Sequence, residues 1–587
     1  GILDKTKIIQ RDHIQLLRRD DGTTKNIRLI DKDNVHNNIL QVINQYEAVG
    51  NKSNRYDVTI LVNGLPLIHV ELKRRGIDLR EAFNQINRYD RDSFWAGSGL
   101  FKYVQLFVIS NGTLTKYYSN TTRHHHIKEQ QGKRQTLKRA NSFEFTSWWA
   151  DETNKPIEDL IGFTKTFFAK HAILNILTKY CVFTIDKQLL VMRPYQIVAT
   201  EKILNRVLVS TNMKQVGTIK AGGYIWHTTG SGKTLTSFKT AQLASEADTV
   251  DKVLFVVDRK DLDYQTMQEY DRFQKGAANS NRSTKVLKLQ LEDPDARIII
   301  TTIQKLSLFV EQNRAHKIYK DHTVIIFDEC HRSQFGDMHR AIRKAFKNYH
   351  LFGFTGTPIF NVNANSGGSP LLKTTEQVFG DKLHTYTIVD AITDRNVLPF
   401  RIDYIDSVQA RLGIADKEVS AIASEEAMMS EHRISAVASY VLEHFDQKTK
   451  RNKTYALDKK RVRGFNSIFA TASIEAAKRY YAMFKSKQHH LPPGDRLKIA
   501  LIYSASPNAE EPDGILEEEH FEPSHLSKTD LNFLDDAIED YNQMFSVSFN
   551  TSGDSFENYY KDVSQRMKER ELDMLIVVNM FLTGFDA

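Results

Sequence analysis

Cysteine is scarce in this chain of 587 residues, which holds two, Cys181 and Cys330, far apart in sequence. Two such residues build neither a disulfide framework nor a cysteine-rich zinc site, so a reducing compartment suits the chain. Long apolar runs are lacking as well, since none reaches the ~18 residues that a membrane-spanning helix needs. The first residues show no secretory signal pattern. We therefore expect a cytoplasmic protein with no membrane partner.

An excess of acidic residues is also lacking: Lys and Arg number 80 against 72 Asp and Glu, which leaves a net charge of +8. This balance permits a polyanionic partner without requiring one. No internal repeat or low-complexity segment is evident, and a chain of this length is expected to form several domains. The run His124–His126 stands among Arg and Lys residues and indicates a solvated loop rather than a metal site.

Residues 223–234, Gly-Tyr-Ile-Trp-His-Thr-Thr-Gly-Ser-Gly-Lys-Thr, predict a buried strand, a glycine-rich turn and the start of a helix. Backbone N–H groups in such a turn close around phosphates, a lysine reaches the β- and γ-phosphates, and a hydroxyl holds Mg²⁺. His227 stands where the strict pattern has glycine. The residues assigned to ATP here are Thr229, Gly230, Ser231, Gly232, Lys233 and Thr234.

A second motif, Val324–His331, is an apolar run that ends in Asp-Glu-Cys-His. Asp328 can bind the same Mg²⁺ through water, and Glu329 can orient the attacking water. A third motif, Phe352–Pro358, ends in Thr-Gly-Thr-Pro. There Thr355 is placed to sense the γ-phosphate. The three motifs together predict an NTP-driven machine.

Two more segments complete the set. Arg193–Gln196 precedes the glycine-rich turn and brings an amide that can read adenine, and Thr583–Asp586 would face ATP and DNA. In this order the motifs resemble those of superfamily 2 helicases and translocases, from about residue 190 to 587, and loops of that type relax the glycine at the position of His227. The residues added to the ATP site are Gln196, Gly584 and Asp586.

Predicted strands alternate with helices in this region, at residues 252–258, 297–302, 323–328 and 350–355. Such alternation predicts parallel sheets covered by helices, with ligands at the carboxyl ends of the strands. Residues at these ends can contact DNA phosphates without reading the base sequence. The candidates are Arg259, Thr301, Thr302 and Gln304. The alternative, that these side chains only cap strand ends, stays open.

The first part of the chain predicts a different site. Tyr56–Val62 and Leu67–Lys73 are expected strands joined at Asn63-Gly64, although Pro66 argues against the simplest two-residue turn. Alternation places Glu71 and Lys73 on one face, and Asp57 on the partner strand can meet them. Two carboxylates that hold Mg²⁺ and a lysine that stabilises the transition state indicate a metal-dependent phosphodiesterase.

The alternative for this Glu-x-Lys pattern is an exposed cross-strand salt bridge, but the residues around Glu71 are apolar. The next segment, Arg80–Tyr89, is an expected helix with Gln85 and Tyr89 on one face. A Gln-x-x-x-Tyr helix after Glu-x-Lys resembles the PD-(D/E)xK nuclease domain of type I restriction endonuclease motor subunits. The resemblance implies that Gln85 and Tyr89 place DNA near the metal. Glu47, at the end of an expected helix over Asn38–Glu47, was considered as a further ligand.

The resemblance extends along the chain, through Ser110–Gly112, Phe255–Leu262, Asp328–Gly336 and Met580–Asp586. We therefore identify the chain as similar to the restriction (R, motor) subunits of type I restriction–modification enzymes. The family implies ATP-dependent translocation of double-stranded DNA, Mg²⁺-dependent cleavage of unmodified DNA away from the recognition site, and a role in phage defence. It also implies assembly with modification (methyltransferase) and specificity subunits, S-adenosylmethionine being bound only by the partner methyltransferase.

The expected fold is α/β: a PD-(D/E)xK nuclease domain followed by two RecA-like parallel-sheet lobes. The predicted boundaries are 1–170 for the nuclease, 171–184 for a helical linker, 185–400 for lobe 1, 401–435 for a connection and 436–587 for an incomplete lobe 2. An arginine that the helicase class supplies to the γ-phosphate would follow residue 587, so this chain is expected to bind ATP better than it hydrolyses it.

Three other functions are compatible with these motifs. The main one is a DNA translocase or remodeller whose N-terminal domain binds DNA without cutting it. The second is a helicase that separates strands, and the third is an assembly subunit whose ATP site is a structural switch. The first differs from the nuclease only in the state of Asp57, Glu71 and Lys73.

Overall fold

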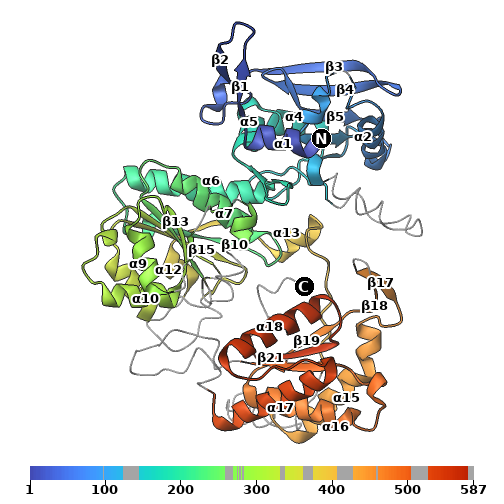
Figure 1. Cartoon of the computed structure of the whole chain (residues 1–587), viewed down its shortest axis with the longest axis vertical. Coiled ribbons are helices and arrows are strands. Elements are labelled where there is room, and N and C mark those ends of the chain that lie inside the picture. Colours follow the sequence, from blue (N-terminus) through green and yellow to red (C-terminus); the bar gives the residue numbers. More distant parts are fainter. Residues whose placement is uncertain are drawn as a thin grey trace, which may run out of the picture. The chain divides into compact units, whose positions relative to one another are not determined.

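The computed structural model describes most of the chain, and its contacts divide it into two units, Gly1–Pro399 and Phe400–Ala587 (Figure 1). No helix in the described part is long and apolar enough to cross a membrane. The residues described are 1–96, 98–122, 145–257, 269–273, 275–276, 279–280, 283–328, 330, 337–360, 374–405, 428–457, 460–503 and 526–578.

The first unit begins with a mixed five-stranded sheet in the order β3-β4-β5-β6-β7, in which only the β5–β6 pair is parallel. Helix α2 covers one face, and helices α1, α4 and α5 pack against the other. β5 is buried on both faces, which explains its nearly continuous apolar sequence. The bounds are β3 Leu40–Val49, β4 Ser53–Val62, β5 Leu65–Leu72, β6 Leu106–Ser110, β7 Thr115–Ser119, α1 Ile2–Gln10, α2 Leu79–Asp92, α4 Leu160–Phe167 and α5 Lys170–Thr178.

The β4–β5 hairpin corrects one expectation. Asn63 (φ 50°) and Gly64 (φ 82°) form a two-residue turn, the type that matches the twist of paired strands. The expectation that Pro66 excludes this turn is wrong, because the register shifts by one residue just beyond it. Leu67 and Ile68, adjacent in sequence, therefore both pack in the same core. This bulge shifts the alternation of faces by one position for the residues of β5 that follow it.

The helix expected over Asn38–Glu47 is also wrong. These residues enter β3, which pairs with β4 along nearly its whole length. β-branched and aromatic residues such as Val42, Ile43 and Tyr46 favour a strand once a partner strand is present, and that partner overrides local helical spacing. Residues 171–184, expected as a linker, contain α5, whose apolar side chains belong to the core of the N-terminal sheet.

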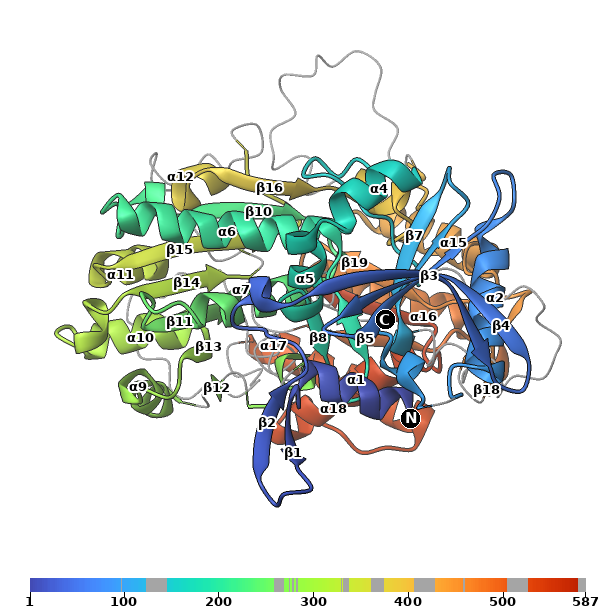
Figure 2. The same cartoon turned by 90° about the horizontal axis from the view of Figure 1, so that it is seen from above.

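The rest of the first unit is built on a seven-stranded parallel sheet in the order β12-β13-β11-β14-β15-β10-β16. Figure 2 shows these strands one below the other. Helices α6 and α7 pack on one face, and α9, α10, α11 and α12 on the other. The bounds are β10 Gly223–His227, β11 Lys252–Val257, β12 Asn279–Ser280, β13 Ile298–Thr302, β14 Thr323–Phe327, β15 Tyr349–Thr355, β16 Lys382–Tyr386, α6 Pro194–Asn212, α7 Lys233–Ser245, α9 Thr284–Glu292, α10 Ile303–Gln312, α11 Asp337–Ala345, α12 Thr375–Phe379 and α13 Ile388–Thr393.

The second unit has a smaller parallel sheet in the order β19-β21-β20, packed among four helices. A separate antiparallel hairpin, β17–β18, precedes β19. The prediction of an α/β chain with two parallel-sheet lobes is therefore confirmed. The bounds are α15 Glu431–Lys448, β17 Thr454–Leu457, β18 Lys460–Arg463, β19 Ser467–Thr471, α16 Ile474–Gln488, β20 Ile499–Ile502, α17 Lys528–Phe545, α18 Gly553–Lys568 and β21 Met574–Val578. Two short hairpins of the first unit are β1 Ile14–Arg18 with β2 Thr24–Arg28, and β8 Cys181–Phe183 with β9 Leu189–Val191.

Gly64→Ala tests the hairpin turn. A Cβ at this position has open space but a φ of +82°, so only backbone strain, about 1 kcal/mol, opposes it. We expect amide exchange in β4 and β5 to become roughly fivefold faster in hydrogen-exchange measurements. Gly494→Ala is the control, because Gly494 also has open space and its φ is not positive. Equal exchange in the two variants would contradict the assignment of the turn.

Candidate functional site

Asp57, Glu71 and Lys73 meet at the end of β5. The β4–β5 pairing runs through Val58 opposite Val70. Asp57, the next residue of β4, reaches across and accepts a hydrogen bond from the Leu72 N–H through Oδ2 at 2.8 Å. The Lys73 Nζ donates to Glu71 Oε1 at 2.8 Å and to the Leu72 carbonyl at 3.3 Å. The structure thus brings together the three residues that the sequence singled out.

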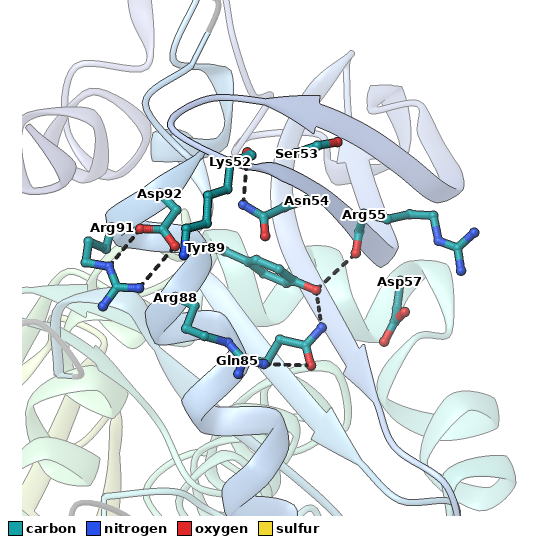
Figure 3. A pocket seen from close by; sticks show the side chains of 10 residues that line it. All are labelled: Lys52, Ser53, Asn54, Arg55, Asp57, Gln85, Arg88, Tyr89, Arg91 and Asp92. Carbon is teal, nitrogen blue, oxygen red and sulfur yellow. Dashed lines mark hydrogen bonds and ion pairs between the residues drawn. The ribbon is translucent and has the colours of Figure 1, made fainter.

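Helix α2 adds the two residues expected on its face. The Lys73 Nζ donates to Gln85 Oε1 at 2.6 Å, and Gln85 Nε2 donates to the Tyr89 hydroxyl. That hydroxyl donates in turn to the Arg55 carbonyl at 3.0 Å. In Figure 3 the Tyr89 ring lies between the Gln85 side chain and the backbone of β4. One chain of hydrogen bonds therefore runs from Lys73 through α2 to the backbone of β4, and it holds the lysine side chain in place.

Glu71 is fully buried. Its Oε2 has no hydrogen-bond partner among the described residues, and the Nε2 of the buried His69 lies 3.4 Å away without the geometry of a hydrogen bond. Burial, and next the charge of Glu71, raise the pKa of Tyr89 above its ordinary value, so this hydroxyl stays protonated. A buried carboxylate oxygen without a donor is costly, which makes the site suitable for a cation.

Magnesium fits the oxygen atoms of this site. The described residues contain no group of three His, Cys, Asp or Glu side chains that could hold a metal. Mg²⁺, however, is commonly bound through one or two carboxylates, with waters and substrate phosphates as the remaining ligands. Asp57 and Glu71 supply two carboxylates. Glu47, considered as a further ligand, is exposed on β3 opposite Arg55.

A cavity of about 480 Å³ opens beside the cluster. Its basic residues outnumber its acidic ones, and Asp92 is already paired with Arg91 at 2.7 Å. Arg88 touches Gln85 Oε1 at 3.3 Å, which links the cavity wall to the lysine site. The lining residues are Lys52, Ser53, Asn54, Arg55, Asp57, Gln85, Arg88, Tyr89, Arg91 and Asp92 (Figure 3). The cavity suits a polyanion at its positive wall and a cation at its acidic end.

The glycine-rich loop lies between β10 and α7. Gly230 (φ 80°) and Gly232 (φ 75°) adopt backbone angles that other residues rarely take, and α7 begins directly afterwards at Lys233. A Cβ at Gly232 would lie 2.9 Å from the Gln196 Nε2. These glycines let the loop turn tightly and leave helix N–H groups directed at the place of an anion.

The start of α6 holds this loop. Gln196 Nε2 donates to the Gly232 carbonyl at 3.1 Å, and its Oε1 accepts from the Arg193 N–H at 2.9 Å. The buried Tyr195 hydroxyl donates to the Ser231 carbonyl at 2.6 Å. Both ends of the Gln196 amide are thus engaged with backbone, and its contact with adenine stays a prediction. The support from Tyr195 was missed in the sequence, where it showed only as part of the Arg-Pro-Tyr-Gln motif.

His227, at the position of the missing glycine, has a buried partner. Its Nε2 lies 2.9 Å from the Nδ1 of His384 on β16. Burial lowers the pKa of His227 well below its usual range and lowers the pKa of His384 to about 4, so both rings are neutral near pH 7. The pair ties the start of the loop to the neighbouring strand. In the sequence, His227 stands out only as a departure from the glycine pattern.

The carboxyl ends of β14, β15 and β10 are adjacent in the sheet, so Asp328, Thr355 and the loop share one edge. Asp328 directly follows β14, and its N–H donates to the Val256 carbonyl at 3.0 Å. A Cβ at Gly356 would lie 3.4 Å from the Thr229 nitrogen, so the segment after β15 lies against the loop. This edge is where ligands of parallel sheets bind.

Of the remaining predicted site residues, some are described by the structure and others lie outside the described part. Thr301 and Thr302 are fully buried, and the Thr302 hydroxyl accepts from the Lys305 N–H at 3.3 Å, which caps α10. Gln304 is half-buried in the first turn of that helix. Their contact with DNA stays a prediction. Outside the described residues lie Arg259, Glu329, Gly584 and Asp586.

Three family models match the chain. One described as the SWI2/SNF2 ATPase matches residues 195–433. One described as the N terminus of the type I restriction enzyme R protein matches residues 1–126, and one described as domain 3 of the type I restriction enzyme subunit R matches residues 463–587.

Curated relatives agree with these models. The SauMSSORF170P endonuclease subunit of a Staphylococcus aureus type I restriction enzyme is 40% identical over all of this chain, which spans 58% of that relative. The EcoprrI endonuclease subunit of Escherichia coli is 49% identical over 39% of this chain and 68% of its own length. The C-terminal part of the MpnIIP endonuclease subunit of Mycoplasma pneumoniae is 50% identical over 34% of this chain and 99% of its own length.

Solved structures resemble the chain more distantly. The type ISP restriction-modification enzyme LlaBIII bound to DNA aligns with 54% of this chain and 23% of its own, at 17% identity and a TM-score of 0.33. The Sulfolobus solfataricus SWI2/SNF2 ATPase core in complex with dsDNA aligns with 69% of this chain and 80% of its own, at 13% identity and a TM-score of 0.27.

Glu71→Gln tests the metal site without any activity assay. Mg²⁺ at ten times its Kd, without nucleotide, should stabilise the wild-type protein by about 1.4 kcal/mol, seen as a higher melting temperature. The variant should lose this gain because the buried carboxylate is gone. Glu81→Gln, an exposed glutamate of α2, is the control and should keep it. If Mg²⁺ raised the melting temperature of the wild type and of both variants equally, the metal would bind elsewhere.

Proposed function

Since this chain belongs to the family of type I restriction enzyme endonuclease subunits, we propose that it acts as a double-stranded DNA translocase driven by ATP and as a magnesium-dependent DNA endonuclease. One observation carries the proposal: Asp57, Glu71 and Lys73 meet at one sheet end of a chain that also holds a glycine-rich loop at the start of a helix. The proposed domains are those expected from the sequence, a nuclease at 1–170 and motor lobes at 185–400 and 436–587.

For cleavage, we assign Asp57 and Glu71 to Mg²⁺, which would make a bound water a nucleophile near neutral pH and stabilise charge on the phosphate. Lys73 holds its ammonium group between Glu71 and Gln85, where it can balance negative charge that builds up on a phosphodiester. Gln85 and Tyr89 keep the ammonium in place, and the basic side of the cavity admits the DNA backbone.

For ATP, Lys233 is assigned to the β- and γ-phosphates, and Thr234 and Asp328 to Mg²⁺. Glu329 orients the attacking water, and Thr355 senses the γ-phosphate. The support is that the loop, Asp328 and Thr355 occupy one sheet edge. The other proposed ATP contacts are Gln196, Thr229, Gly230, Ser231, Gly232, Gly584 and Asp586, and the proposed DNA contacts are Arg259, Thr301, Thr302 and Gln304.

The two activities form one process in this proposal. The motor pulls unmodified duplex DNA in the cytoplasm, as a defence against phage, and the nuclease cuts it away from the recognition site. Modification and specificity subunits supply site recognition, and S-adenosylmethionine binds only to that methyltransferase core. The alternative, a translocase whose N-terminal domain binds DNA without cutting, requires that Asp57, Glu71 and Lys73 serve no cleavage.

The test uses the full-length subunit with its modification and specificity subunits, ATP, Mg²⁺ and unmodified circular DNA that carries one site. Lys233→Ala should lose ATP turnover and cleavage together, because cutting depends on the motor. Glu71→Ala should keep ATP turnover and lose cleavage by roughly 100-fold or more. Glu81→Ala, exposed on α2, should keep both. Undiminished cleavage by Glu71→Ala would favour the non-cutting DNA-binding domain.

A further inference from the structure

Positive charge is concentrated in one short segment of the second unit. Eight lysines and arginines and a single aspartate stand among residues 448–463, a net charge of +7 in a chain whose total is +8. The segment includes the end of α15 and the hairpin β17–β18, which Figure 1 shows as a two-stranded ribbon. We call residues 454–457 and 460–463 the basic ribbon.

The basic ribbon has two different faces. Tyr455 pairs with Val462 in register, and both are half-buried. Because neighbouring residues of a strand point to opposite faces, Arg461 and Arg463 lie on the face opposite that of Tyr455 and Val462, and both are exposed. Their cross-strand neighbours are the small residues Ala456 and Thr454. Arg461 and Arg463 are thus two exposed cations on one face of the ribbon.

Aromatic and cationic contacts hold the inner face. The Tyr455 and Phe465 rings lie 4.7 Å apart, and the Arg570 guanidinium lies over both of them. Arg570 also donates to the Gly464 carbonyl at 2.7 Å. Gly464 has a φ of +58°, and a Cβ there would lie 2.6 Å from the Thr449 carbonyl oxygen. The ribbon is therefore a fixed element and presents its outer face in a defined direction.

Seven of these eight cations are among the described residues, and they fall into two groups. Three are neutralised where they anchor the ribbon: Lys448 by Asp403, Arg451 by Asp573, and Lys460 by Glu569 and Glu571. Four others, all exposed, form no ion pair within the described part of the chain: Lys450, Lys453, Arg461 and Arg463. Ion pairing thus neutralises Lys448, Arg451 and Lys460, whereas the two arginines of the outer face have no ion-pair partner among the described residues.

We infer that the basic ribbon is a duplex-DNA backbone contact of the second motor lobe, with Arg461 and Arg463 each binding a phosphate. Residues two apart on a strand lie about 6.6–6.8 Å apart on one face, close to the separation of neighbouring phosphates. Guanidinium groups bind phosphate in a bidentate fashion and without reading sequence, as a translocase requires. This inference rests on the proposed function, since the DNA must be the substrate of the motor.

The experiment measures binding of the full complex to duplex DNA without a recognition site, across a range of salt concentrations. Arg461→Gln/Arg463→Gln should lower the slope of log K against log salt by about 1.8, since each neutralised phosphate contributes about 0.9. Affinity at 0.1 M salt should fall by about tenfold or more. Arg461→Lys/Arg463→Lys, which keeps the charges, should restore most of the slope. ATP turnover without DNA should stay unchanged.

Lys487→Gln/Lys528→Gln is the matched control, because it removes two charges from α16 and α17, outside the ribbon. It should leave the slope within error of wild type. An unchanged slope in the arginine variant would overturn the inference. The same result with weaker assembly of the complex would assign the ribbon to an acidic protein partner. A wild-type complex with no DNA affinity would instead defeat the proposed function.

Discussion

One ammonium group organises the N-terminal site. The Lys73 Nζ donates to a buried carboxylate, to a backbone carbonyl and to the Gln85 amide, so it joins β5 to α2. Removing one partner of such a buried pair leaves a charge that water cannot reach, which is why the surrounding residues serve to keep the lysine in place. Tyr89 holds Gln85, and Asp57 closes the strand end through the Leu72 N–H. The cavity wall and the proposed cation site both take their geometry from this arrangement.

The glycine-rich loop between β10 and α7 is also held in place by neighbouring residues, here through contacts from α6 and β16. A glycine-rich turn has little side-chain packing of its own, so its shape comes from the elements beside it. Tyr195 and Gln196 hold two successive loop carbonyls, and His384 holds His227 at the start of the loop. In both sites the residues assigned to chemistry are positioned by a layer that performs none. The two sites therefore depend on packing within one unit of the chain.

The sequence was informative where structure follows from neighbouring residues or from a regular spacing of residue types. Strand alternation placed Glu71 and Lys73 on one face, and an Asn-Gly turn brought Asp57 near them. The alternation of strands with helices predicted the parallel sheets. The sequence was misleading where contact with a residue far along the chain determines the local structure. Most of the segment 38–47 became a strand because β4 pairs with it, and the β4–β5 register shifts just after Pro66. Tyr195 and His384 were missed since their partners lie 36 and 157 residues away, and no pattern in a single sequence links positions so far apart.

The bulge in β5 determines which face of the sheet each side chain after it occupies. Leu67 and Ile68 share one side of the sheet, so the residues after them are shifted by one position and Glu71 faces α2 instead of the aliphatic core. A slip of one residue in the β4–β5 register would exchange these faces, whereas a slip of two would restore them. Because the bulge already holds one extra residue, loss of that residue would leave the pairing beyond it, and therefore the face on which Glu71 lies, unchanged.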